Sequence, residues 1–334
     1  LLTYQQSKIL QTGVMMLCPK CTNNHKKSDG PYCRCGYRFV FRPDVDNGLT
    51  DNKFMLILRK ARADGRYYFT LSQLYCFYRT MKGKINLSSI MAKYILIGFL
   101  VVLIFPVSWQ VVFFLIALTA FIHIIMLYYR EPLTEEEFRT LVNKWSTAKG
   151  FPDKMLVKPS LHEPPSAFPE RDVYNYNYGV EGILIVQKQI IVDLLVRNGF
   201  HTDQRVLIFS VDGYPSYIEE QAKKLLQASP ELPIYLLHDA TEEGMAMRKK
   251  IKIPTSHKVV DLGMSPDQLQ NFPTLKPLRL QEQGYNAPLD VLPYAALSAM
   301  GTAAIAAGIP FDEVLVSWKR EGNSVGDSSV SSYG

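Results

Sequence analysis

Residues 183–188 read Ile-Leu-Ile-Val-Gln-Lys, residues 206–209 read Val-Leu-Ile-Phe, and residues 233–237 read Pro-Ile-Tyr-Leu-Leu. Each stretch contains a short apolar run and is followed by a segment whose apolar residues recur with helical spacing. A fourth run, Lys-Val-Val-Asp-Leu, lies at residues 258–262. Apolar strands that alternate with helical crossovers predict an α/β domain whose parallel sheet is covered on both faces.

The helices of this domain are predicted from the same pattern. Helical spacing covers residues 191–199, 215–227 and 242–250, and an apolar, Ala-rich helix covers 291–310. We therefore assign the α/β domain to residues 173–290, followed by a C-terminal helix at 291–317 and a Ser- and Gly-rich tail at 318–334 that is predicted to be disordered.

Polar residues follow the predicted strands. They are Gln187 and Lys188 after the first strand, the stretch Asp-Gly-Tyr-Pro at 212–215 after the second, and the stretch His-Asp-Ala-Thr at 238–241 after the third. In open parallel sheets, ligands bind beyond the carboxyl ends of the strands. This edge is therefore the place where we expect chemistry.

The order of these segments resembles the Toprim domain of the topoisomerase VI A subunit and its meiotic break-forming relatives. The likeness covers about residues 180–250, and its most specific part is Gly-Tyr-Pro at 213–215. In that family, a glutamate and an Asp-x-Asp pair hold magnesium for strand transesterification. The resemblance thus implies a Toprim-like fold and a magnesium site.

This chain departs from the family at the residues that would hold magnesium. Gln187 stands where the glutamate is expected, Asp239 matches the first aspartate, and Thr241 replaces the second. Three carboxylates become one, and the neutral groups do not restore the lost charge. A single carboxylate supports weak Mg²⁺ binding at most unless other acids contribute.

Neighbouring acids could rebuild such a site. Asp212, Glu242 and Glu243 are the candidates, and His238 beside Asp239 is a candidate acid, base or phosphate contact. The alternative is that the aspartates cap helices or stabilise turns, as they commonly do at such positions, and that His238 is a satisfied structural residue.

Four of the five cysteines form a compact cluster. Cys18 and Cys21 are followed after eleven residues by Cys33 and Cys35. Paired cysteines on short turns bring four soft ligands to one tetrahedral ion, so residues 1–46 are predicted to be a zinc-ribbon-like knob with structural zinc. The second pair is Cys-x-Cys where zinc ribbons usually have Cys-x-x-Cys.

A long apolar stretch interrupts the first half of the chain. From Tyr94 to Tyr129, 36 residues pass without Asp, Glu, Lys or Arg. One helix of that length would reach about 54 Å, against a hydrocarbon core of about 30 Å. Pro106 and the polar residues after it favour two short spans, so residues 87–130 are predicted to be a transmembrane hairpin. The alternative is a buried hairpin of a soluble domain.

Charge is distributed unevenly around that stretch. Residues 1–93 carry 16 Lys and Arg against 5 Asp and Glu, a balance of +11, and the remainder of the chain carries −5. Such a basic block favours anionic lipid or nucleic acid as a neighbour, or simply marks the cytosolic side of a membrane. A two-span hairpin returns the chain to its starting side, and thiolate cysteines favour a reducing compartment. Both soluble regions are therefore predicted to face the cytosol.

Two further segments complete the predicted organisation. Residues 47–86 are expected to be helical, with a break at Asp64-Gly65 and with Thr70 or Ser72 capping the second helix. Residues 70–76 loosely resemble the winged-helix motif that carries the nucleophilic tyrosine in the topoisomerase VI family. Cys76 stands at the nucleophile's place, and Tyr75 and Tyr78 are formal alternatives.

Residues 131–172 follow the hairpin and include several prolines from Pro159 onward. They are predicted to be a linker.

Three functions compete on these observations. The first is a membrane-anchored, non-catalytic adaptor that binds protein partners. The second is a Mg²⁺-dependent nuclease or phosphotransfer enzyme that uses Asp212, Asp239 and Glu242. The third is a membrane tether for nucleic acid that acts through residues 1–93. The loss of acidic residues favours the adaptor and argues against an enzyme.

Overall fold

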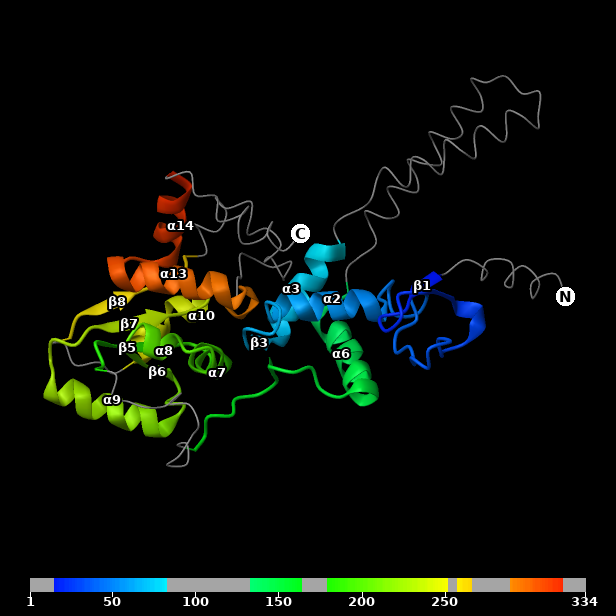
Figure 1. The fold of residues 1–334 in the computed structure, drawn as a ribbon. Coiled ribbons are helices and arrows are strands. Elements are labelled where there is room, and N and C mark those ends of the chain that lie inside the picture. Colours follow the sequence, from blue (N-terminus) through cyan, green and yellow to red (C-terminus); the bar gives the residue numbers. More distant parts are fainter. Residues whose placement is uncertain (1–14, 83–132, 164–178, 252–256, 266–288, 321–334) are drawn as a thin grey trace, which may run out of the picture.

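The computed structural model of the chain describes residues 15–82, 133–163, 179–251, 257–265 and 289–320 (Figure 1). The predicted transmembrane hairpin at residues 87–130 lies outside the described residues, as do most of the predicted C-terminal tail and the first fourteen residues. Within the described residues, no single helix has the length and apolarity needed to cross a membrane. Two helical segments, Tyr294–Ala307 and Phe311–Ser317, are together long and apolar enough to cross a membrane, but they meet at a bend of 95°.

A parallel four-stranded sheet organises the second half, as predicted. Its strand order is β6-β5-β7-β8. The strands are β5 (Gly182–Val186), β6 (Val206–Ser210), β7 (Ile234–Leu237) and β8 (Val259–Asp261). Val186 is in register with Ser210 on one side and with Leu237 on the other, so the carboxyl ends of these strands lie at one edge.

Helices cover both faces of this sheet, because apolar side chains project from the strands on both sides. One core packs Leu184, Val186 and Ile208 against the helices α7 (Gln189–Arg197), α13 (Tyr294–Ala307) and α14 (Phe311–Arg320). The other packs Ile183, Ile185 and Leu207 against α9 (Ser216–Ala228). In Figure 1, α9 and α13 lie on opposite sides of the sheet. Three short helices complete this half: α8 (Phe200–Asp203), α10 (Glu242–Met245) and α11 (Met247–Lys250).

The C-terminal helical unit differs from the prediction of one helix over residues 291–317. It consists of the 3-10 turn η4 (Leu289–Val291), α13 and α14. Gly308 adopts a left-handed φ of 66° at the end of α13, and Pro310 precedes α14. A left-handed residue followed by proline ends a helix, so two helices form.

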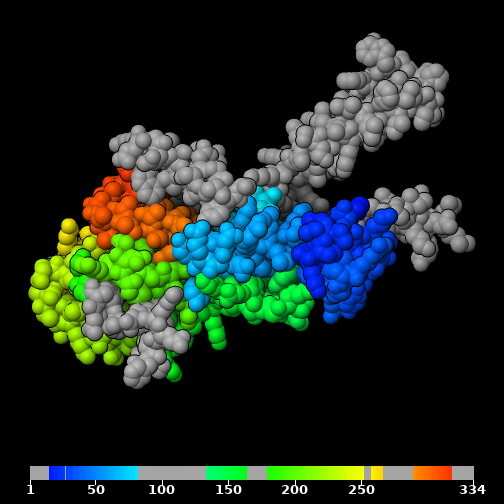
Figure 2. All heavy atoms as spheres, viewed as in Figure 1, coloured from blue at the N-terminus to red at the C-terminus, as the bar shows by residue number. Residues whose placement is uncertain are grey.

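The first half folds as a cysteine-containing knob and a helix cluster. The knob contains β1 (Met15–Leu17), β2 (Asn24–Lys26) and the 3-10 turn η1 (Lys27–Asp29). The cluster contains α2 (Asp51–Ala61), β3 (Phe69–Thr70), α3 (Leu71–Lys82), α6 (Glu135–Lys149) and β4 (Met155–Leu156). Figure 2 shows the knob at one end of the body, next to the helix cluster.

Of the two residues predicted to cap α3, Thr70 and Ser72, the structure shows Thr70 in that role. The backbone N–H of Gln73 donates to Oγ1 of Thr70 at 3.1 Å, and the N–H of Thr70 donates to Oε1 of Gln73 at 3.0 Å. This reciprocal pair satisfies two backbone donors that the first helical turn leaves free.

The prediction of a linker over residues 131–172 is wrong for its first part, because α6 forms there. Thr134 caps α6 in a reciprocal pair with Glu137, and one face of the helix buries Phe138, Val142 and Trp145. These positions recur at helical spacing, which the acidic residues at the start of the segment obscured.

The part of the linker that follows α6 is also bound. Strand β4 pairs in parallel with β3, and Ser160 donates to the buried Asp193 on α7. Residues 155–161 are therefore fixed against both the helix cluster and the α/β domain.

Phe138 provides the sharpest test of the helix cluster. Its side chain is fully buried and contacts the rings of Phe54, Tyr75 and Tyr78. We expect Phe138→Ala to lower the free energy of unfolding by about 3–5 kcal/mol, because truncating a buried ring leaves a cavity.

Phe151→Ala is the matched control, since Phe151 is 59% exposed. Its expected effect is within about 0.5 kcal/mol. Urea unfolding followed by circular dichroism would measure both variants. Equal losses in the two variants would contradict the packing described here.

Candidate metal centre and the carboxyl edge of the sheet

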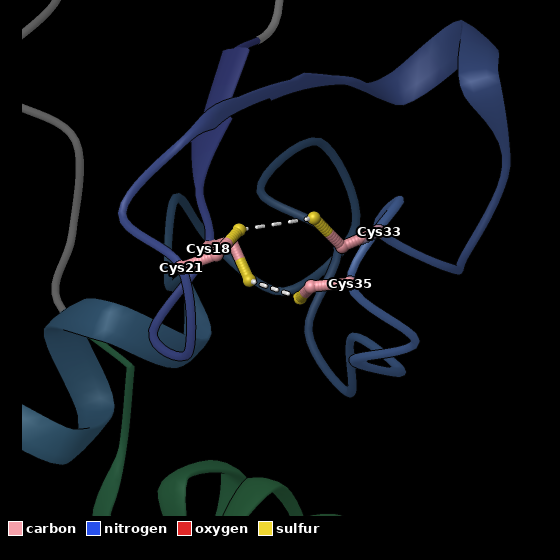
Figure 3. A group of neighbouring side chains, drawn as sticks. All are labelled: Cys18, Cys21, Cys33 and Cys35. Carbon is pink, nitrogen blue, oxygen red and sulfur yellow. Dashed lines mark hydrogen bonds between the residues drawn. The ribbon is translucent and has the colours of Figure 1, made fainter.

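The four predicted metal ligands converge. Cys18 and Cys21 come from the turn after β1, and Cys33 and Cys35 come from a second turn, with all four sulfurs directed toward one another (Figure 3). Gly36 follows the second pair with a φ of 82°, and its N–H donates to the carbonyl of Cys33. The left-handed glycine lets the backbone turn directly after the Cys-x-Cys pair.

The spacing of the sulfurs fits a tetrahedral ion. The Cys18–Cys35 and Cys21–Cys33 sulfur pairs are each 3.6 Å apart, and all four sulfurs lie within 4.8 Å of one another. A tetrahedron with metal–sulfur bonds of about 2.3 Å has sulfur–sulfur edges of about 3.8 Å. The cluster could therefore hold a metal ion with four protein ligands, which leaves no position for a substrate.

The pKa values of Cys18 and Cys21 are shifted in opposite directions. Burial opposes ionisation of Cys18, but the backbone N–H groups of Cys21 and Lys20 lower its pKa to about 7. For Cys21, the N–H of Asn23 lowers the pKa, whereas burial and the three neighbouring sulfurs raise it to about 12. Cys18 therefore ionises more readily than Cys21 beside it, and a bound cation would favour the thiolate form of its ligands.

The knob is fastened to the helix cluster by buried polar contacts. Asp51, the first residue of α2, is fully buried and accepts hydrogen bonds from the Tyr37 hydroxyl and the Phe41 N–H, both at 2.8 Å. Lys144 of α6 forms an ion pair of 2.7 Å with the buried carboxylate of Asp46. The knob that carries the four cysteines is thus attached to both α2 and α6.

The predicted polar edge of the sheet is present, with Asp239 at its centre. The side chain of Asp239 is 4% exposed, one oxygen accepts the N–H of Leu289 at 2.8 Å, and the other lies 2.7 Å from Nζ of Lys188. Gln187 accepts the backbone N–H of Asp239 through Oε1 at 2.9 Å. Burial raises the pKa of Asp239, and Lys188 opposes that rise.

The other predicted acids do not join Asp239. Across the described segments, the four cysteines are the only group of three or more His, Cys, Asp or Glu residues that converges. Asp212 follows β6, and β5 separates β6 from β7, so two strand spacings of about 4.8 Å intervene. Asp212, Glu242 and Glu243 are exposed. The acidic site predicted from Asp212, Asp239 and Glu242 is therefore not assembled.

Thr241, where the second family aspartate is expected, has a local structural role. Its Oγ1 accepts the backbone N–H of Gly244 at 3.0 Å and caps the short helix α10. A threonine performs this role well, since a hydroxyl oxygen satisfies a free helix donor.

His238 lies between two acceptors in a closed site. Its Nδ1 donates to the carbonyl of Asp239 at 2.8 Å, and its Nε2 lies 3.0 Å from Oδ1 of Asp261, without the alignment of a hydrogen bond. A Cβ added at Gly263 would meet the imidazole ring at 2.2 Å. Burial lowers the pKa of His238, but the Asp261 carboxylate and the Asp239 carbonyl outweigh it, so the pKa is raised. His238 is 1% exposed, which supports the structural alternative over contact with a ligand.

The candidate tyrosines of α3 are packing residues. Tyr75 and Tyr78 are each 4% exposed, and the Tyr75 hydroxyl donates to the carbonyl of Leu133 at 2.6 Å. Cys76 is buried in the apolar core of the α/β domain, and burial raises its pKa to about 11. A thiol with so high a pKa is a poor nucleophile at neutral pH.

The sequence reasoning assigned no role to Lys188, which pairs with Asp239, or to Asp290, which pairs with Lys188. Lys188 was noted at the strand end without a role, and Asp290 carries no local signal because it is 102 residues away from Lys188. Nζ of Lys188 lies 3.1 Å from Oδ1 of Asp290, so the lysine bridges two carboxylates.

The metal centre can be tested with two serine variants. We expect Cys33→Ser to reduce the metal content of the purified chain from about one ion per molecule, because a neutral hydroxyl is a poor replacement for a thiolate ligand. Cys76→Ser is the matched control and should leave the metal content unchanged. Mass spectrometry of the metals would measure both. Equal metal content in wild type and Cys33→Ser would refute the assignment.

The ion pair of His238 predicts a definite pH dependence. We expect its pKa in the folded chain to lie above the usual 6.5, and Asp261→Asn to lower it. The stabilisation is complete below the unfolded pKa and is lost as pH rises through the folded one. Nuclear magnetic resonance of ¹⁵N-histidine would follow the titration. A midpoint at or below 6.5, or one that Asp261→Asn leaves unchanged, would show that the pair does not form.

Comparisons with known proteins leave the chain without an assigned family. No protein-family model matches the sequence, and neither curated proteins nor solved structures give a match.

Proposed function

We propose that the chain is a membrane-anchored, non-catalytic adaptor. In this proposal, the knob holds structural zinc, residues 87–130 anchor the chain as a hairpin, and the α/β domain is a Toprim-like scaffold that no longer catalyses. Four cysteine ligands in a reducing compartment favour zinc over other common metals.

The observation that carries the proposal is the shared core of the two segments that flank residues 83–132. Tyr75 and Tyr78 on α3, before the gap in the described residues, contact Phe138 on α6 after it. The Tyr75 hydroxyl also donates to Leu133, close to the point where the described chain resumes. Segments that share a core lie on the same side of any membrane, so an even number of crossings must separate them.

Two spans satisfy both the topology and the length. The 36 residues without Asp, Glu, Lys or Arg are too many for one crossing of about 30 Å and suit two short ones. The basic residues before the stretch favour the cytosolic side for both flanks.

The non-catalytic part of the proposal is supported at the sheet edge. Asp239 is buried and already bound to Lys188 and Leu289, and no group of three or more described His, Cys, Asp or Glu residues includes it. The Mg²⁺-dependent alternative therefore has little to support it in the described residues.

The knob provides the best support for a partner-binding role. Met15 and Leu17 of β1 are 54% and 39% exposed, and their register partners Lys26 and Asn24 on β2 are exposed beside them. Directly paired residues project from the same face of a sheet, so this face combines apolar and basic side chains. Such a face suits a protein surface that is apolar with acidic groups. The nucleic-acid alternative would instead give binding that weakens steeply with salt.

Labelling tests the anchoring directly. Val45→Cys lies before residues 87–130 and Phe151→Cys lies after them, and both native side chains are 59% exposed. In sealed membrane vesicles that contain the full chain, we expect an impermeant maleimide to modify both introduced cysteines or neither, because both flanks share one side. The native chain provides the background control.

Modification of one introduced cysteine and protection of the other would refute the shared side. Extraction with alkaline carbonate separates anchoring from topology. The full chain should stay in the membrane pellet, whereas a variant with a Gly/Ser linker in place of residues 94–129 should become extractable and keep its metal. An extractable full chain would contradict anchoring.

A further inference from the structure

One lysine joins two carboxylates at the junction of the molecule's halves. Lys188 follows β5, Asp239 follows β7, and Asp290 belongs to η4. Nζ of Lys188 lies 2.7 Å from Oδ2 of Asp239 and 3.1 Å from Oδ1 of Asp290. The side chains of the two aspartates are 4% and 13% exposed, so solvent screens their charges weakly.

The remaining carboxylate oxygens are bound to protein donors. Oδ1 of Asp239 accepts the N–H of Leu289, and Oδ2 of Asp290 lies 3.1 Å from the hydroxyl of Ser72, which is equally close to Oε1 of Glu135. Among the described side chains, only Lys188 forms an ion pair with either aspartate. The balance between the two negative charges thus depends on one ammonium group.

The charge state of Lys188 fits this arrangement. Burial lowers its pKa, but the carboxylates of Asp290 and Asp239 outweigh burial, so the pKa is raised above the usual value and the amine stays protonated. Two buried carboxylates without a cation would be unstable, since desolvation and mutual repulsion both oppose their charged forms.

The same oxygens would suit a hard divalent cation. Carboxylate oxygens are the ligands that Mg²⁺ and Mn²⁺ prefer, and Asp239 and Asp290 face one point from two different elements. An ammonium at that point supplies positive charge and hydrogen-bond donors while it occupies the position of an ion.

We propose that the ammonium of Lys188 is the resident cation of this junction and takes the place of a divalent ion between Asp239 and Asp290. It holds η4 on the edge of the sheet and denies both carboxylates to divalent ions. The inference deepens, and rests on, the non-catalytic part of the proposed function. It does not depend on membrane anchoring.

Lys188→Gln gives the decisive comparison. This change removes the charge and keeps a side chain of similar length, so the two carboxylates lose their cation. We expect the midpoint of thermal unfolding to fall by several degrees. We also expect Mn²⁺ to bind at least about tenfold more tightly than to the wild type and to restore stability, because the ion replaces the lost charge.

Three further variants separate this role from simple packing. Lys188→Arg keeps the charge and should respond to Mn²⁺ like the wild type. Lys188→Gln combined with Asp239→Asn should lose the gained binding. Lys223→Gln removes an exposed lysine from the surface pair with Glu219 and should resemble the wild type in both stability and ion binding.

The measurements use the full chain in detergent with its knob loaded with metal, titrated with Mn²⁺ and followed by electron paramagnetic resonance and thermal unfolding. Two results would overturn the proposal. The first is that the Lys188→Gln variant gains no Mn²⁺ binding, or gains binding that the additional change Asp239→Asn leaves intact. The second is that the wild type binds Mn²⁺ and that Asp239→Asn removes this binding.

Should Lys188→Gln fail to fold, recovery of folding in Mn²⁺ supports the proposal and failure to recover contradicts it. None of these readouts depends on the vesicle labelling, so anchoring and this inference can fail separately.

Discussion

The short segment Leu289–Leu292 binds both halves of the molecule, and their relative position depends on it. From the helix cluster, the Thr70 hydroxyl donates to the carbonyl of Asp290 at 2.9 Å, and the Gln73 amide donates to the carbonyl of Leu292. From the sheet, Asp239 and Lys188 bind Leu289 and Asp290 as described above. These groups are mostly buried, so water cannot bind them in the folded chain. Removing one partner would therefore leave the other polar group without a hydrogen bond, which destabilises the fold.

A second buried network fixes the segment after β4 against the sheet. Asp193 on α7 is fully buried and accepts the Tyr214 hydroxyl at 2.5 Å and the Ser160 hydroxyl at 2.6 Å, while the N–H of Leu161 donates to Tyr214. Burial and the bond to Asp193 raise the pKa of Tyr214. Within Gly-Tyr-Pro, the most specific part of the predicted resemblance, the tyrosine therefore has a clear structural use.

Several polar groups of the sheet edge interact with one another. Lys188 with Asp239 and Asp290, His238 with Asp261, and Thr241 with its own helix each form a pair or a cap within the protein. The cysteine cluster of the knob contrasts with this edge, because its four sulfurs converge on one point and could hold a metal ion.

The sequence alone determined what depends on short-range pattern. The four strands, the crossover helices after the first two strands and the cysteine cluster were predicted correctly, and Thr70 was one of the two residues predicted to cap α3, because apolar periodicity, capping residues and paired cysteines act within a few residues of each other. The tertiary structure decided which charges meet. Lys188 reaches Asp290 across 102 residues, and Asp212 stays apart from Asp239 because β5 lies between their strands. The linker prediction missed α6 although Phe138, Val142 and Trp145 recur at helical spacing, and the tertiary structure shows that Phe138 on this face packs against Phe54 and Tyr75. The physical reason is that the order of the strands and the docking of distant loops decide which charged side chains lie close together. The local spacing of residues determines neither.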